Sequence, residues 1–534
     1  MKKIIIEQRN KFNLINILVT LLLAFIIYFI ALPALNIQSI GFWVYIISII
    51  GIYIFLNTIT GINEKGSLVD NIKIITYLTG SIGVLIMAII VINFFFSPIF
   101  NSKSYANRIK VDKSEEFLKD VEKVNFDHLP LLDKNSSQKL GDRVMGQMPE
   151  LVSQFYVSDL YTQINYNNEI VRVTPLEYNG FFKYLANYKK GVKGYITVNS
   201  VNGKSKLVKL KEGMKYMPSA MIMKNLDRKL RFTYPTKFFG EESFELDNEG
   251  NPYWIIPTLK FSGIELKRDV EGLIILNPIT GESKYYKVKD VPRWVDHVYS
   301  ASMIIEQLND WGLYTSGFIN SLFGQKNVVK STEGYNYTLM NDDVYLYTGI
   351  TSVASDEANL GFILSNMRTK ETKFYAVPGA QETSAMGSAK GQVQQMNYTP
   401  TFPLLINLNN KATYLISLKD NAGLVKMYAF VDVLDYQKVA VTDASKGIEA
   451  AAQAYLGDIE IADSELTKKT ITIKTISTAT ISSNTYYFIT DESDNKYYVS
   501  IKVSKSKLPF LKVGDTLKIS YKGETELKEI NKIG

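Results

Sequence analysis

The stretch LINILVTLLLAFIIYFIALPAL, residues 14–35, decides the fold class of this 534-residue chain. It contains no charged side chain, and the uncharged run that includes it extends from Phe12 through Asn63. About 20 predominantly apolar residues are enough for an α-helix to cross the hydrocarbon core of a bilayer. The sequence therefore predicts a membrane-spanning helix at residues 14–35.

Two more stretches of the same kind follow. Residues 42–60 lie in the same uncharged run, and residues 74–100 lie in a second run that reaches Ser102. The loop 36–41 is short and uncharged, so the first two spans are predicted to form a tight hairpin. A cleaved signal peptide is the competing interpretation of the first span, but the apolar run is long and another span follows directly. We therefore expect a three-span α-helical anchor over residues 1–102.

The cations that flank the spans predict an orientation, because cytoplasmic loops carry an excess of lysine and arginine. The segment before the first span carries four cations, and the loop between the second and third spans carries two lysines. Three crossings then leave the N-terminus in the cytoplasm and the large C-terminal region outside a bacterial plasma membrane. Four cations just beyond the third span are a contrary signal. The cations of the inner side are Lys2, Lys3, Arg9, Lys11, Lys65 and Lys73, and the contrary ones are Lys103, Arg108, Lys110 and Lys113.

Composition excludes several classes of function. The formal net charge is +7, but the region after the spans is only weakly and evenly basic, so no nucleic-acid partner is expected. The absence of cysteine rules out disulfides, thiolate metal sites and cysteine nucleophiles. No ionisable residue lies within a span, which argues against a transporter, pump or channel. The lipid bilayer is thus the first predicted partner, and the spans are interpreted as an anchor.

Motifs for catalysis and cofactor binding do not occur. The two histidines, His128 and His297, are far apart in the sequence, and each is interpreted as a surface or core residue instead of a metal ligand. There is no nucleophile elbow, phosphate-binding glycine loop or zinc signature. The sequence therefore predicts no catalytic, metal-binding or cofactor-binding residue, and no cofactor.

The segment 103–164 is polar and is predicted to be a helical collar between the membrane and the body. Phe117, Val121 and Val124 recur at helical spacing, and a second apolar series runs over residues 140–155 behind two serines that are candidate caps. Two short helices are expected here.

From residue 165 the sequence changes to short alternating strands with Asn, Gly and Asp turns, and it contains an internal similarity. The stretch VKGYITVNSVNGKSKLVKLK, residues 192–211, aligns without a gap on VEGLIILNPITGESKYYKVK, residues 270–289, and nine of the twenty positions are identical. A weaker third copy covers residues 361–375, and a fourth candidate covers residues 426–441. Coincidence is the alternative, because Gly and Asn turns between strands are common.

Each copy is interpreted as a hairpin, in which glycine opens an apolar strand and a tight Asn/Gly turn leads into a second strand. A further hairpin precedes some copies, at residues 247–256 and 409–416, where Asp247–Asn251 lacks the terminal glutamate of a calcium loop and is interpreted as a turn. A helix is predicted after each copy. The sequence thus predicts tandem α+β modules over residues 165–460. The helical candidates are Ser219–Leu226, Ser300–Leu308, Ser384–Gln394 and Ala444–Tyr455.

The hairpin GLIILNPITGESKYY, residues 272–286, resembles the strand–turn–strand of PepSY domains, which are extracytoplasmic modules associated with protease inhibition and envelope proteins. A broader likeness, which spans most of the chain, is carried by the stretches at residues 175–178, 231–235, 334–337, 347–353, 378–386 and 418–426. Together these stretches resemble a widespread uncharacterised multi-spanning membrane-protein family of low-GC Gram-positive bacteria. The resemblance implies a location in the membrane and no particular activity.

Residues 465–534 are predicted to form a separate small β-barrel of OB type. Strand candidates are 471–476, 486–489, 497–503 and 516–521. Such barrels bind nucleic acid or sugar through a basic groove with exposed aromatics. The lysines and the four tyrosines here are a faint version of that pattern, so packing or protein contact is the preferred interpretation. The tyrosines are Tyr486, Tyr487, Tyr497 and Tyr498.

Carboxylates are the remaining candidates for chemistry, because four acids bracket the tyrosine-rich stretch 345–347. Paired acids near aromatics fit a glycosidase, and oxygen ligands fit calcium; the competing interpretation is that they cap hairpin turns. The acids are Asp342, Asp343, Asp356 and Glu357. Two functional hypotheses follow. The preferred one is a non-catalytic, membrane-anchored envelope protein that binds a protein partner or a cell-wall polymer. The alternative is an extracytoplasmic carboxylate-dependent hydrolase.

Overall fold

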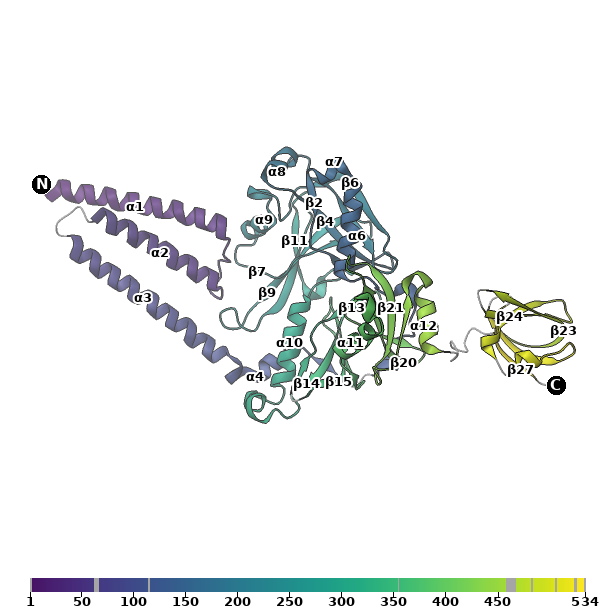
Figure 1. The fold of residues 1–534 in the computed structure, drawn as a ribbon. Helices are drawn as coiled ribbons and strands as arrows, with labels where there is room; N and C mark the ends of the chain where they lie inside the picture. Colours follow the sequence, from purple (N-terminus) through teal and green to yellow (C-terminus); the bar gives the residue numbers. More distant parts are fainter. Residues whose placement is uncertain are drawn as a thin grey trace.

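The chain has three parts that follow one another in sequence: long apolar helices, a β-rich body and a small barrel (Figure 1). The structure is a computed structural model that describes residues 2–61, 67–113, 116–353, 355–457, 467–481, 484–504, 507–522 and 526–532.

Three helices form the first part: α1 (Lys2–Ala31), α2 (Ile40–Gly61) and α3 (Ser67–Phe96). Each contains a window long and apolar enough to cross a membrane, at Leu14–Ala31, Ile40–Ile59 and Thr76–Phe96. The predicted spans are therefore confirmed as helices of spanning length. In the pair α1 and α2, Asn16 Nδ2 donates to Asn57 Oδ1 at 3.0 Å, which satisfies two amides inside an apolar region.

The first and third helices end earlier than the sequence predicts. Leu32 has φ 50°, and Pro33 follows it, so α1 ends at Ala31 and not at Leu35. The predicted third span, residues 74–100, is interrupted at Ser97, where Pro98 begins the separate helix α4 (Pro98–Ala106). Proline is favoured at the first position of a helix because its missing amide donor is not needed there.

The body contains four sheets. The first has β2 (Phe155–Val157), β3 (Thr162–Tyr166), β4 (Glu169–Tyr178), β5 (Val192–Asn199) and β6 (Ser205–Met214). The second has β7 (Phe238–Phe239), β8 (Ser243–Leu246), β9 (Pro252–Lys260), β10 (Asp269–Leu276) and β11 (Ser283–Lys287). The third has β12 (Val329–Ser331), β13 (Asn336–Met340), β14 (Asp343–Ser352), β15 (Ser355–Asn366) and β16 (Thr372–Tyr375), with β1 (Val111–Asp112) and β17 (Gly379–Ala380) at its edges. The fourth has β18 (Thr399–Pro400), β19 (Leu404–Leu408), β20 (Lys411–Lys419), β21 (Val425–Asp432) and β22 (Val439–Asp443).

The same strand order occurs in all four sheets. Two short strands pair with one long strand, which is followed by two more antiparallel strands, as in β2-β4-β5-β6 with β3 also on β4. The four hairpins predicted at residues 192–211, 270–289, 361–375 and 426–441 are the last two strands of each sheet. The hairpins predicted at 247–256 and 409–416 also form, as β8 with β9 and β19 with β20.

Three of these hairpins turn in the same way. The side-chain oxygens of Asn199, Asn277 and Asn366 each accept from the two backbone amides that lie two and three residues later. The backbone oxygen of each asparagine accepts from the amide four residues later, which belongs to Gly203, Gly281 or Lys370. All three of those residues have φ between 63° and 79°. The asparagine is therefore the residue that shapes the turn.

In three of the four copies, a glycine near the start of the first strand meets the backbone of the next strand. A Cβ atom on Gly272 would lie 2.4 Å from the carbonyl oxygen of Tyr286, and one on Gly361 would lie 2.2 Å from that of Tyr375. The pairing register also shifts next to Gly194 and Gly272. A side chain at these positions would force the bulged strands apart, which explains the choice of glycine.

Helices α9 (Leu226–Thr233), α10 (Ala301–Tyr314), α11 (Glu382–Gln392) and α12 (Ile448–Leu456) follow the four hairpins. The predicted helix 219–226 is wrong, because α9 begins only at Leu226. Within the predicted range, residues 222–224 form only a short 3-10 helix, and the side chain of Asn225 caps α9 by accepting from the Arg228 amide at 3.0 Å. The helix α10 lies in a core shared by the second and third sheets, and α11 lies in one shared by the third and fourth.

The segment 103–164 is not a helical collar, and this prediction needs correction. It contains α5 (Phe117–Asp120), α6 (Lys134–Gly146) and α7 (Pro149–Val152), but also β1, β2 and most of β3. After α5 the chain runs extended beside β19, where Val124 N donates to Asn407 O at 2.9 Å. The helical spacing of Phe117, Val121 and Val124 is therefore outweighed by backbone pairing with a distant strand.

The last part is a closed barrel of β23 (Thr467–Ile481), β24 (Asn484–Asp491), β25 (Lys496–Ser500), β26 (Thr516–Lys522) and β27 (Glu526–Lys532), in the order β23-β24-β25-β27-β26. The four strand candidates lie in this barrel, except that residues 501–503 form a 3-10 turn. The strand β27 was not predicted from the sequence. It pairs with β26 and, in parallel, with β25, which closes the barrel.

Candidate functional site

An open groove of about 390 Å³ lies where the third and fourth sheets meet the segment 117–129. One wall is the end of β13 with the turn into β14, at residues 338–342, and another is β19 at residues 404–407. Phe117, Tyr347 and Leu364 contribute apolar surface. The groove therefore combines an apolar base with walls drawn from three distant segments of the chain.

Polar groups line the same groove. Asp120 accepts from Lys373 Nζ at 3.3 Å and from the Tyr375 hydroxyl at 3.2 Å. Asn407 Nδ2 donates to Val121 O at 2.8 Å, while its buried Oδ1 has no hydrogen-bond partner among the described residues. His128 and Lys123 are exposed at the rim. Such a mixture suits binding, because apolar contact supplies affinity and a few fixed polar groups set orientation.

The structure does not bring the four candidate acids together. Asp342 lines the groove, in a turn where Asn341 and Asp342 have φ of 50° and 63°. Asp343 begins β14, whereas the backbone of Asp356 and Glu357 lies beside the far end of that strand, where Ser352 pairs with Ser355. At about 3.3 Å per residue, the length of β14 separates the two pairs by roughly 30 Å. The side chains of Asp356 and Glu357 lie outside the described residues.

Asp343 is held in an ion pair. Arg368 donates to its two oxygens from Nε at 2.9 Å and from Nη2 at 2.6 Å, and Asn366 Nδ2 donates at 2.8 Å. The arginine belongs to the β15–β16 turn, so this contact fastens one hairpin to the strand beside it. A carboxylate that is held by three fixed side-chain donors has a structural role between the two strands.

His297 lies beside a buried pair of acids and not in the groove. Its Nε2 is 2.7 Å from Gln163 O, and its backbone amide donates to Glu245 Oε1 at 3.2 Å. Asp296 is 3% exposed, and burial together with Glu245 raises the pKa of its carboxyl well above the usual value. Glu245 is fully buried as well. Asn165 N of the first sheet donates to Asp296 Oδ2, and Asp296 N donates to Glu245 of the second sheet, so this buried cluster joins the two sheets.

The burial of Glu177 leads us to expect that the free energy of unfolding of the protein depends on pH. It is 2% exposed and accepts from the amide and the hydroxyl of Ser219, and burial raises the pKa of its carboxyl to about 7. The folded protein thus holds this proton more tightly than the unfolded chain does. The stabilisation is complete below the unfolded pKa of about 4.5 and is lost as pH rises through about 7. We expect a loss of about 2–3 kcal/mol between these limits.

Denaturant unfolding of the full chain in nanodiscs across this pH range measures the effect. The variant Glu177→Gln should flatten the pH dependence, whereas Glu150→Gln, at an exposed position, should leave it unchanged. An unaltered slope in Glu177→Gln would show that this carboxyl is not the group responsible.

The barrel tyrosines are divided between the surface and the interior. Tyr497 is 4% exposed, and its hydroxyl lies 3.2 Å from Lys469 Nζ, which also contacts Asp491 at 3.1 Å. The rings of Tyr486 and Phe488 each lie 6.4 Å from that of Tyr498, and Phe488 is 37% exposed. One aromatic side chain of the predicted set therefore packs in the core, and a small aromatic cluster forms nearer the surface.

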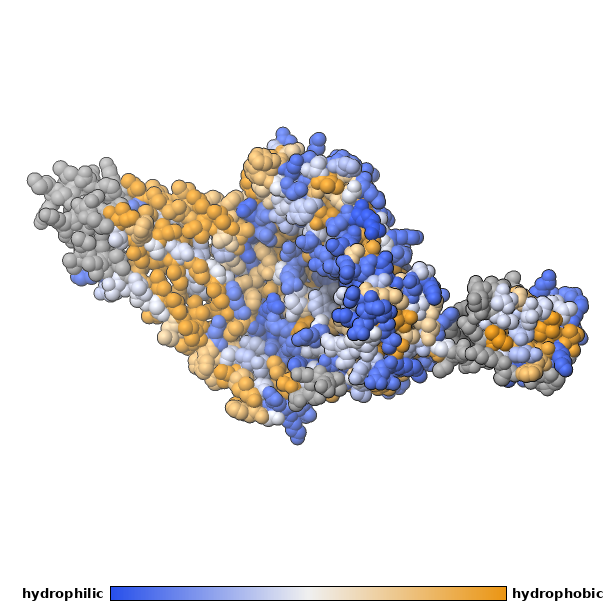
Figure 2. Space-filling model, viewed as in Figure 1, coloured by the Kyte–Doolittle hydropathy of each residue, from blue (hydrophilic) through white to orange (hydrophobic). Residues whose placement is uncertain are grey.

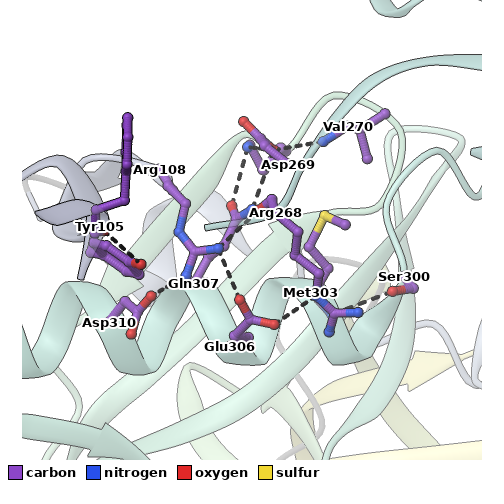
Figure 3. A network of polar contacts seen from close by, with 12 residues as sticks. Tyr105, Arg108, Arg268, Asp269, Val270, Ser300, Met303, Glu306, Gln307 and Asp310 are labelled. Carbon is purple, nitrogen blue, oxygen red and sulfur yellow. Dashed lines mark hydrogen bonds and ion pairs between the residues drawn. The ribbon is translucent and has the colours of Figure 1, made fainter. Parts of the chain in front are cut away.

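A contact site that the sequence did not predict joins the third apolar helix to the body (Figure 3). Arg108 follows α4 and is paired with Glu306 at 2.9 Å and with Asp310, both on α10. Glu306 also accepts from Arg268 Nε at 2.7 Å. Tyr105 lies next to Arg108, and its hydroxyl donates to Phe96 O at the end of α3. In the sequence Arg108 was counted only as a cation near a span.

Comparison of the chain with models of protein families and with curated proteins gives no match. The groove is therefore interpreted from its own geometry. Among the described residues, no three histidine or acidic side chains gather as they would around a metal ion. The arrangement can hold a ligand or a partner segment against an apolar base.

Proposed function

We propose that this protein is a membrane-anchored, non-catalytic component of the cell envelope that binds a protein partner or a cell-wall polymer through its β-rich body. The groove between β13, β19 and the segment 117–129 carries the proposal, because it is open, partly apolar and lined by fixed polar groups. The ion pair of Asp343 and the separation of the four acids support binding over hydrolysis.

The location is part of the proposal. We place the N-terminus in the cytoplasm and the body on the outer face of the plasma membrane. The four cations of the N-terminal segment, together with Lys65 and Lys73 near the start of α3, support this orientation. Impermeant thiol labelling of single cysteines at Ser67 and at the exposed Ser445 tests it, because the chain has no native cysteine.

The domain assignments also belong here. We infer that the four sheets are tandem PepSY-like modules and that the C-terminal barrel is of OB type. The shared strand order and the shared asparagine turns support the repeat. The order of the barrel strands and the parallel pairing of β25 with β27 support the OB assignment. Modules of these kinds are commonly used for contact with other molecules.

Filling the groove tests the binding function. Thr338 lies in β13 and lines the groove at a half-buried position. Thr338→Trp should abolish the cellular phenotype of the gene, as should deletion of residues 165–460. The double change Asp356→Asn, Glu357→Gln should preserve it, and Asp342 is kept because it lines the groove. Asp343 is kept, since its loss would break the ion pair with Arg368.

The matched control is Asn202→Trp, at an exposed position in the β5–β6 turn. It adds the same side chain away from the groove and should leave function intact. Loss of function in the double variant, with normal folding and insertion, would favour the hydrolase alternative. Full function in Thr338→Trp would remove the groove from the proposal.

A further inference from the structure

The body is fixed to the ends of the apolar helices by direct hydrogen bonds. Leu35 N donates to Pro235 O at 2.8 Å, and Asn93 Oδ1 accepts from Ile264 N at 2.8 Å. Arg228 Nε donates to Phe29 O at 3.1 Å near the end of α1. The bilayer around the helices therefore has a defined position relative to the body, and one side of the body faces it (Figure 1).

The level of the membrane surface is marked by aromatic residues at this end of the helices. The rings of Tyr28 and Tyr45 lie 6.0 Å apart, and Trp43 Nε1 donates to Ile37 O at 2.8 Å. Tyrosine and tryptophan concentrate where hydrocarbon meets headgroups, because their rings are apolar and their hydrogen-bonding groups need water or polar partners. The helix ends that touch the body thus have the character of a membrane interface.

Two projections of the body expose large apolar side chains beside these helix ends. The first consists of α8 (Phe181–Asn187) and the neighbouring turn η2 (Ile222–Lys224). Its exposed fractions are 79% for Phe182, 50% for Phe181 and 65% for Ile222. We call it the α8 projection. A soluble surface seldom gathers several apolar side chains at such exposure unless they meet a partner.

Hydrogen bonds connect the α8 projection to the first apolar helix. Arg228, which donates to Phe29 O, also donates from Nη1 to Ile222 O at 2.7 Å. The hydroxyl of Tyr184 on α8 donates to Met221 O at 3.1 Å. The projection is therefore beside the end of α1 and is held there.

The second projection is the loop after α10, which contains η4 (Asn320–Gly324). Phe323 is 82% exposed, Ile319 67% and Leu322 54%. The ring of Tyr314 lies 6.2 Å from that of Tyr105 and stacks on Phe318 at 6.3 Å, which connects the loop to α4 and the end of α3. We call it the η4 projection. Figure 2 shows apolar surface at both edges of the side that faces the helices.

Cationic side chains accompany both projections. Lys189 and Lys190 follow α8 and are exposed, and Lys326 is exposed just after η4. Apolar and aromatic side chains flanked by lysine are typical of segments that lie in the plane of a bilayer interface. The apolar groups of such segments enter the lipid by about 5–10 Å, and the cations meet anionic headgroups.

We propose that the α8 and η4 projections insert into the headgroup region of the membrane that holds the three helices, so that the body rests on the lipid surface at two points on either side of the helix ends. This docking fixes the groove at a set height and tilt above the bilayer. The inference does not depend on which face of the membrane the body occupies, so it stands or falls separately from the proposed function.

Spin-label accessibility in the full-length protein tests the proposal. Because the chain has no cysteine, single nitroxides can replace Phe182 and Phe323 in nanodiscs of phosphatidylethanolamine and phosphatidylglycerol. Phe510, which is 73% exposed in the C-terminal barrel, is the matched control. We expect the ratio of oxygen to nickel-chelate accessibility to be several-fold higher at 182 and 323 than at 510, because oxygen partitions into lipid and the chelate stays in water.

Labels at Leu185 and Leu322 repeat the measurement on the same two projections at neighbouring exposed positions. They should give the same elevated ratio, which would show that the result does not come from one altered side chain. A water-like ratio at either projection, equal to that at position 510, would overturn the proposal and leave the exposed apolar groups for a protein partner.

Discussion

The substitution Gly281→Val is expected to destabilise the second sheet by about 2–5 kcal/mol, roughly twice the effect of Gly203→Val. Gly281 has φ 79°, a region in which a residue with a side chain costs roughly 1–2 kcal/mol and a β-branched one more. A Cβ atom there would also lie 2.3 Å from the ring of Tyr216. The ring or the turn must move, and such overpacking adds about 1–3 kcal/mol.

Gly203 occupies the same place in the equivalent turn of the first sheet and is the matched control. Its φ is 73°, but the nearest atoms to a Cβ are the methyl groups of Leu132 and Leu140 at 3.4 Å, an ordinary contact distance. Gly203→Val should therefore cost only the backbone strain, about 1–2 kcal/mol. Denaturant unfolding of the full chain measures both. Equal effects would contradict the role given to Tyr216, and two neutral substitutions would contradict the shared turn.

Loss of Arg108 is the second large effect that we expect. Its side chain is 5% exposed and bridges Glu306 and Asp310 on α10, so Arg108→Met leaves Asp310 without its cation and Glu306 with Arg268 alone. Removing one partner of a buried ion pair usually costs about 3–5 kcal/mol. Glu306 is 38% exposed and keeps Arg268, so we expect about 2–4 kcal/mol here.

Two further variants show whether the cost comes from the uncompensated charge. Burial raises the pKa of Asp310, and Arg108 opposes that rise, so Arg108→Met with Asp310→Asn should recover part of the stability. Arg268→Met removes a more exposed partner of Glu306 and should cost less than about 1 kcal/mol. Hydrogen exchange in nanodiscs should show faster exchange in α4 and α10 of Arg108→Met. Unchanged exchange there would contradict a structural junction at this point.

The candidate site was only partly predictable. Asp342 and His128 were singled out in the sequence, and both line the groove. Nothing in the sequence placed them together, because the groove is formed by strands and an extended segment that lie hundreds of residues apart. The helical spacing of Phe117, Val121 and Val124 predicted a helix, yet residues 121–124 pair with β19, and that pairing builds one wall of the groove.

The sequence by itself determined the features that depend on neighbouring residues. Long uncharged runs predicted the three apolar helices, and strand alternation with asparagine turns predicted the paired hairpins, because helix length, strand period and turn geometry are properties of short segments. Only the tertiary structure decided where those segments meet. Arg108 pairs with acids about 200 positions later in the chain. The exposed side chains of α8 lie beside the end of α1, and those of η4 lie near α4 and the end of α3. Such contacts depend on how whole sheets and helices pack together, and local sequence patterns do not predict them.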